Sequence, residues 1–324
     1  MRRREFFKAS AGAGLAVGLP ELAPLEAGPR IGRDLPVQLR MRTERLRRLD
    51  DILGGGDTYR VYLGEYQATK AVLRDGSYTD ETGRSLLSVL AEQAQQAGWA
   101  AFDAGKSSDA RSLYEASHLA ATDAGDRVLA GNALAFLAYQ QTSVNPQAGI
   151  DMAIESCRTA GAEAPSGVRA LLHERLAWAY AVAGLASQTE QALRSAEDAL
   201  SENDGLPQPD WAAWVDSREL QIMTGRCWTE LRRPIRAVPV LESALARFDD
   251  AHARDKSLYL SCLATSCLAA GEVEQAATIT TQVLELSAGV ASVRPRQRIA
   301  PVLQELSAHR AVPAVAEAMD MAGV

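Results

Sequence analysis

The sequence predicts an all-α protein, an α-solenoid in which helical hairpins stack side by side. Hydrophobic residues make up 47% of the 324 residues but aromatic residues only 6%, so alanine and leucine must supply most of the packing. From residue 91 onward, amphipathic segments recur in pairs separated by short breaks. Small residues recur at matching places in these pairs, which suits helices whose backbones approach closely and argues against a β-rich domain.

The first pair spans Ala91–Ala121 and sets the pattern for the others. Gly98 and Ala110 are small residues, Gly105 marks the break, and Tyr114 follows four residues after Ala110. The small residues allow close helix contact, and the aromatic ring fills the space between one hairpin and the next. This spacing resembles the tetratricopeptide repeat, and the resemblance implies a right-handed solenoid of TPR-like helical hairpins.

About five hairpins are expected within residues 91–290. The second is predicted over Arg127–Cys157, the third over Val168–Leu200, the fourth around Gly225–Leu245 and the fifth over Leu258–Leu284. The turn of the third needs an insertion of about three residues to keep the repeat in phase. Residues 36–90 and 291–324 are predicted as capping helices, because the ends of a stacked array would otherwise expose apolar faces.

Residues 1–35 form a separate N-terminal segment. Its start resembles a twin-arginine export signal, with a weakly apolar run after the motif and a Pro/Gly-rich connection at residues 20–35. The apolar run is too short for a membrane span. The motif residues are Arg3, Arg4, Phe6, Phe7 and Lys8.

The expected capping region contains a basic helix and a glycine-rich turn. Val37–Leu53 carries four clustered arginines, interpreted as a solvated face balanced by nearby acidic residues, with a patch for phosphate or an acidic partner as the alternative. Residues 54–56 are all glycine and are predicted to end this helix. Asp57 or Thr58 is expected to cap the next helix, Tyr59–Arg74.

The chain shows no motif for catalysis, metal binding or a cofactor, so none of the three is predicted. The four histidines lie in four different segments, and the four cysteines have no CxxC spacing and are interpreted as small core residues. Paired carboxylates are interpreted as solvated helix faces. The formal net charge of −7 disfavours direct binding of nucleic acid.

Several segments resemble the helical sensor half of actinobacterial transcriptional regulators that join a helix-turn-helix domain to tetratricopeptide repeats. The resemblance covers roughly residues 37–310 and implies control of secondary metabolism or development through a bound small molecule, peptide or partner protein. The sequence departs from the family in having no N-terminal DNA-binding domain. The segments are RLRRLDDILGGGDTY (45–59), AEQAQQAGWAAFDAG (91–105), AGNALAFLAYQ (130–140), RLAWAYAVAG (175–184), GRCWTELRRP (225–234) and LAAGEVEQAA (268–277).

A binding groove is predicted on the concave face, which the first helix of each hairpin lines in a right-handed stack. Aligning the hairpins on their small residues brings several aromatic rings together with one arginine that can anchor an anion. The alternative is that these rings pack between hairpins and do not reach solvent. The predicted groove residues are Trp99, Phe102, Asn132, Phe136, Tyr139, Glu174, Trp178 and Arg226.

The favoured function is a cytoplasmic, non-enzymatic sensor or adaptor that binds a peptide, small molecule or partner protein in this groove. One alternative is a binding module exported through the twin-arginine route, and a second is an enzyme recruited from the scaffold within a biosynthetic cluster. The sequence also permits a homodimer.

Overall fold

The structure, a computed structural model, describes residues 30–324 except residues 51, 203 and 247. Within these residues the protein is all-helical, and the nearest approach to a sheet is a single isolated bridge between Arg30 and Ser77. The helices are α2 (Asp34–Asp50), α3 (Gly55–Asp75), α4 (Asp80–Asp103), α5 (Ser107–Ala124), α6 (Arg127–Thr142), α7 (Pro146–Ala160), α8 (Ser166–Val182), α9 (Ala186–Ser201), α10 (Ser217–Glu230), α11 (Pro234–Leu245), α12 (Ala253–Ala269), α13 (Val273–Ser287), α14 (Arg294–Leu306) and α15 (Pro313–Ala322), with short 3-10 turns η1 (Asp210–Ala212), η2 (Asp250–His252) and η3 (Ser307–His309).

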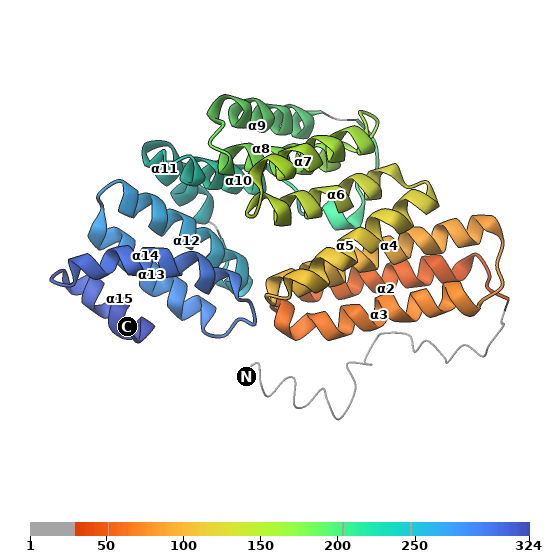
Figure 1. The fold of residues 1–324 in the computed structure, drawn as a ribbon, viewed down its shortest axis with the longest axis horizontal. Coiled ribbons are helices and arrows are strands. Elements are labelled where there is room, and N and C mark those ends of the chain that lie inside the picture. The colour runs from red at the N-terminus through yellow and green to blue at the C-terminus, as the bar shows by residue number, and fades with distance from the viewer. Residues whose placement is uncertain (1–29, 51, 203, 247) are drawn as a thin grey trace.

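The helices pack in neighbouring pairs, as the sequence predicts. Within residues 80–287 the pairs are α4 with α5, α6 with α7, α8 with α9, α10 with α11 and α12 with α13, and α3 also packs extensively against α4. The first helices of successive pairs also contact one another, from α4 through α6, α8 and α10 to α12. Figure 1 shows the pairs following one another along an arch, with α2 and α3 at one end and α14 and α15 at the other.

Small residues allow the paired helices to approach closely, at the positions that the sequence analysis predicts. A Cβ atom on Gly98 would lie 2.5 Å from Cε1 of Tyr114, and one on Gly225 would lie 2.5 Å from Cγ of Leu241. Because real Cβ atoms do not come so close to other atoms, each glycine is required for the observed approach of its helix to the next.

Each hairpin turns over three residues, namely 104–106, 143–145, 183–185, 231–233 and 270–272. The insertion expected in the third turn was therefore wrong. Thr189 follows Gly184 at the distance at which Ala110 follows Gly105, so it takes the place of the expected small residue, and it is fully buried. Thr tolerates this close position because its hydroxyl donates to the carbonyl of Leu185 one turn earlier.

The glycine-rich segment does form a turn, but its capping differs from the prediction. Helix α3 begins at Gly55, four residues earlier than expected, and Gly54 occupies the N-cap position with no side-chain hydrogen bond. Neither Asp57 nor Thr58 caps it. Instead the buried carboxylate of Asp103, at the end of α4, accepts a hydrogen bond of 2.8 Å from the Gly55 N–H. A carboxylate suits this place because the first N–H groups of a helix carry partial positive charge.

The two ends of the arch are in contact. The Gly56 N–H donates to the Ala291 carbonyl at 2.8 Å, and the Val293 N–H donates to the Asp103 carbonyl at 3.0 Å. The Ser292 hydroxyl donates to the Asp103 carboxylate at 2.7 Å. The segment after α13 therefore joins the C-terminal helices to the junction of α3 and α4.

Two arginines of the basic face of α2, Arg42 and Arg47, form ion pairs with carboxylates of other helices. Arg42 forms a bidentate pair with Glu65 of α3. Arg47 pairs with both Glu92 of α4 and Asp210 of η1. The interpretation as a simple solvated face was wrong for these two arginines, because tertiary packing brings distant carboxylates to them.

Candidate functional site

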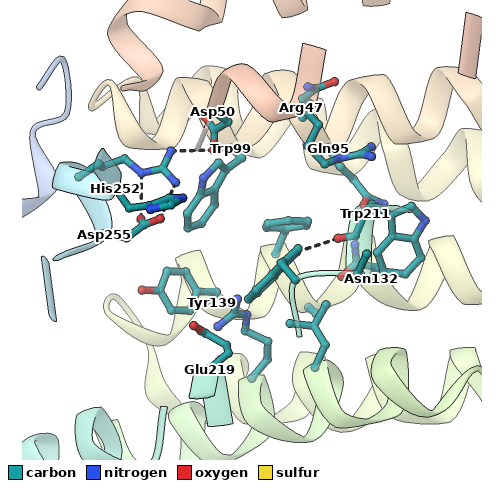
Figure 2. Close-up of a pocket in the computed structure, with 18 of the residues that line it drawn as sticks. Arg47, Asp50, Gln95, Trp99, Asn132, Tyr139, Trp211, Glu219, His252 and Asp255 are labelled. Carbon is teal, nitrogen blue, oxygen red and sulfur yellow. Dashed lines mark hydrogen bonds and ion pairs between the residues drawn. The ribbon is translucent and has the colours of Figure 1, made fainter. Parts of the chain in front are cut away.

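A cavity of about 540 Å³ lies within the arch, between the first helices of the hairpins and the two connecting turns η1 and η2. In Figure 2, Trp211 lies towards one end of the cavity and His252 and Asp255 towards the other, with Trp99 and Tyr139 in its wall. The volume lies within the range of small-molecule sites, which is about 300–1,000 Å³. Its lining combines seven aromatic rings, which are Trp99, Phe136, Tyr139, Trp211, Trp214, Phe248 and Tyr259, with seven arginines, which are Arg47, Arg48, Arg175, Arg218, Arg226, Arg254 and Arg294.

Five of the eight predicted groove residues line this cavity: Trp99, Asn132, Phe136, Tyr139 and Arg226. They reach it from α4, α6 and α10, all of them first helices of their hairpins. The ring centroid of Trp99 lies 5.9 Å from that of Phe136 and 6.3 Å from that of Tyr139. The aromatic residues therefore form one continuous wall.

The other three predicted residues lie behind this wall. Phe102 packs against both Trp99 and Tyr139, with centroid distances of 5.9 Å. Trp178 lies 5.9 Å from Tyr139 on the far side of that ring. Glu174 is completely buried and is absent from the cavity lining. The interpretation that the rings pack between hairpins therefore describes Phe102 and Trp178, whereas Trp99, Phe136 and Tyr139 line the cavity.

Tyr139 lies among positive charges. Its hydroxyl oxygen accepts a hydrogen bond of 2.8 Å from Arg226 and another of 3.0 Å from Arg294. The guanidinium of Arg175 lies 5.3 Å from the centre of its ring. Burial by itself would raise the pKa of the Tyr139 phenol, but the three arginine charges outweigh it and lower the pKa to about 7. At neutral pH this side chain therefore carries a substantial share of negative charge.

Two carboxyl groups have raised pKa values: Glu219, which lines the cavity, and Glu174, which is buried and does not. Burial raises the pKa of Glu219 to about 7, although the charges of Arg175 and Arg226 oppose the shift. Burial also raises the pKa of Glu174 well above its usual range, and neither of its carboxyl oxygens has a hydrogen-bond partner among the described residues. Both groups are therefore at least partly protonated at neutral pH and only weakly offset the arginines.

On the opposite side of the cavity, arginines form ion pairs with carboxylates. The Arg254 guanidinium lies 2.6 Å from the Asp50 carboxylate and 2.9 Å from that of Asp255, and it is 8% exposed. Arg47 likewise has two carboxylate partners, Glu92 and Asp210. These pairs join α2 to α4, to η1 and to α12, so they brace the walls of the cavity.

Several lining residues were missed by the sequence analysis. Arg175 adjoins Glu174 in α8, and Arg294 begins α14, in a region that was predicted only as capping helices. Trp211 and Trp214 lie in the long connection between α9 and α10. One signal was available, since two tryptophans within a long loop are notable in a chain with few aromatics, and long loops in compact proteins are usually functional.

Among the described residues, no group of histidine, cysteine and acidic side chains is arranged to hold a metal ion. Nor is any helix in this part of the chain long and apolar enough to cross a membrane. The predicted export motif, Arg3 to Lys8, lies outside the described residues. The cavity lining offers flat apolar surfaces for a ring and guanidinium groups for negative charge.

Comparison with known proteins identifies no relative, since no protein-family model and no curated protein matches the chain.

Proposed function

We propose that this protein is a non-enzymatic sensor, a right-handed α-solenoid of TPR-like hairpins that binds a small molecule within its arch. The cavity of about 540 Å³ walled by aromatic rings carries this proposal. A cavity of this size favours a compact ligand over an extended peptide or a partner protein. Most ligand pockets combine apolar walls with a few polar groups in this way.

The resemblance to the sensor half of helix-turn-helix/TPR regulators supports a signalling role for ligand binding. In such a role, the ligand stabilises one arrangement of the arch, and a partner protein detects the difference. Contacts through Asp103 and Arg254 join the two ends of the arch. A ligand that touches both α4 and α12 would bridge the same two ends, so its binding could stabilise one arrangement of the arch.

The test uses N-phenyl-1-naphthylamine, a neutral aromatic dye small enough for the cavity. We expect one saturable site per chain, detected by energy transfer from tryptophan, because Trp99, Trp211 and Trp214 line the cavity. Trp99→Ala should weaken binding by about tenfold through the lost ring contact, with unchanged helical content by circular dichroism.

A matched control is Tyr180→Ala, which removes another half-buried ring: Tyr180 belongs to α8, packs against the cores between neighbouring hairpins and does not line the cavity. This variant should bind the dye as the wild type does. No saturable binding, or equal loss in both variants, would reject the small-molecule site in favour of a peptide or protein partner.

A further inference from the structure

Three arginines from different hairpins converge on one wall of the cavity. Arg175 belongs to α8, Arg226 to α10 and Arg294 to α14, and all three line the cavity around Tyr139. We refer to Arg175, Arg226 and Arg294 as the arginine cluster. Like charges repel, so their convergence in a largely buried place calls for a compensating negative charge.

The protein itself supplies little of that compensation to Arg226. This side chain is 5% exposed, and no described carboxylate lies within 4.0 Å of its guanidinium. Its Nε atom is buried without a hydrogen-bond partner. One Nη atom donates to the thioether sulfur of Met223 at 3.0 Å, which is a weak acceptor, and the other to Tyr139.

Arg175 and Arg294 are similarly undercompensated. The only hydrogen bond that Arg175 makes within the described chain is a long one of 3.7 Å to the Met223 sulfur, and it forms no ion pair there. Arg294 lies 3.8 Å from the Asp103 carboxylate, but that carboxylate already accepts hydrogen bonds from Gly55 and Ser292.

The arginines on the opposite wall of the cavity, unlike the arginine cluster, are compensated by carboxylates. Arg47 and Arg254 each have two carboxylates within ion-pair distance. The arginine cluster has one carboxylate at ion-pair distance, that of Asp103 at 3.8 Å from Arg294, beside the Tyr139 oxygen and the partly protonated Glu219. One wall is therefore neutralised by the protein, and the other retains positive charge facing the cavity.

We infer that the ligand is a flat aromatic or conjugated molecule carrying an oxyanion, a carboxylate or a similar group, which the arginine cluster holds. This inference rests on the proposed function and names the chemical class of its ligand. The ring would lie against Trp99 and Phe136, and guanidinium forks match planar oxyanions through paired hydrogen bonds. Arg175 also lies 5.9 Å from the centre of the Trp214 ring, so anion and ring recognition occur side by side.

The test compares two dyes of nearly the same shape. 8-Anilinonaphthalene-1-sulfonate carries one sulfonate, and N-phenyl-1-naphthylamine lacks it. We expect the sulfonate dye to bind at least about tenfold more tightly, because charge-assisted hydrogen bonds are the strong ones. The net charge of −7 works against this order, so a preference for the anion cannot arise from the overall charge of the chain.

Arg175→Gln is the decisive variant, because Arg175 forms no ion pair that the fold depends on. It should weaken binding of the sulfonate dye much more than binding of the neutral dye and so remove most of the preference, and Arg175→Lys should restore part of it. Arg218→Gln is the matched control, since it removes the same charge from an exposed part of the cavity lining, away from the arginine cluster.

The outcomes separate the two proposals. If neither dye binds saturably, the proposed function fails together with the inference. If both dyes bind equally in the wild type, the cavity binds small molecules but the inference about the oxyanion is wrong. If Arg175→Gln and Arg218→Gln reduce the preference equally, the effect is general electrostatics and the arginine cluster is not the site.

Discussion

Asp103 offers the most direct perturbation of the arch, because one buried carboxylate connects three segments. It accepts hydrogen bonds from the Gly55 N–H at the start of α3 and from the Ser292 hydroxyl after α13, and its side chain is 0% exposed. Arg294 lies 3.8 Å from it. Asp103→Ala removes all of these interactions and leaves two buried donors and a guanidinium without their acceptor.

The expected loss follows from these contacts. A hydrogen bond to a charged group contributes about 1.5–3 kcal/mol, so two such bonds correspond to about 3–6 kcal/mol. Water entering the space left by the side chain recovers part of this, and we expect a loss of about 4 kcal/mol in the free energy of unfolding. For a cooperative transition of this size, that corresponds to a fall in Tm of about 6 °C. Asp103→Asn keeps one acceptor oxygen and should lose about half as much.

Chemical and thermal unfolding followed by circular dichroism measure the effect. Asp123→Ala is the control, because Asp123 is an exposed carboxylate near the end of α5 and its removal should change stability by less than about 0.5 kcal/mol. The alanine variant should also bind N-phenyl-1-naphthylamine more weakly, because the ends of the arch separate. A loss below about 1 kcal/mol for Asp103→Ala would refute the argument that this carboxylate holds the ends together.

Three further predictions concern packing and titration. Gly98→Ala should lower stability by about 1 kcal/mol in urea unfolding, since the clash with the buried ring of Tyr114 costs more than the gain in helix propensity, and a stabilised variant would contradict the close approach of α4 and α5. Binding of 8-anilinonaphthalene-1-sulfonate should weaken from pH 6 to pH 8, because Tyr139 and Glu219, each with a pKa of about 7, become negative beside the arginine cluster; His252 and Asp255 also line the cavity, and Glu174 is buried behind it. Tyr139→Phe should bind the dye more tightly and lose part of the pH dependence, and unchanged binding in this variant would exclude the phenol as a competing anion. Burial raises the pKa of Cys157 from near 9 to about 11, so its reaction with a thiol reagent at pH 8 should be about 100-fold slower than in the unfolded chain, and a rate equal to that of the unfolded chain would contradict its burial.

The pairing of helices could be predicted from the sequence because it depends on local patterns. Gly98 and Gly225 lie where two helices of one hairpin must touch, and the partner residue follows sixteen positions later in each case, Tyr114 and Leu241. Spacing along a helix places such residues on one face, so a short stretch of sequence is sufficient. Capping of α3 could not be predicted in this way, because its acceptor, Asp103, lies 48 residues away.

The candidate site was predictable only in part, for a related reason. Trp99 and Tyr139 could be placed because a repeated hairpin puts equivalent positions on the same face of the stack. Trp211 lies in a connection outside the repeat, and Arg294 is 155 residues from the Tyr139 oxygen that it contacts. No periodic pattern relates such residues.

The pairing of the helices and the close contacts within hairpins were thus determined largely by the sequence, since a few neighbouring side chains decide the energy of each. The closure of the arch at Asp103 and the gathering of Arg175, Arg226 and Arg294 around Tyr139 were decided only by the tertiary structure. Small rotations between successive hairpins accumulate along a stack, and that sum determines which distant residues meet.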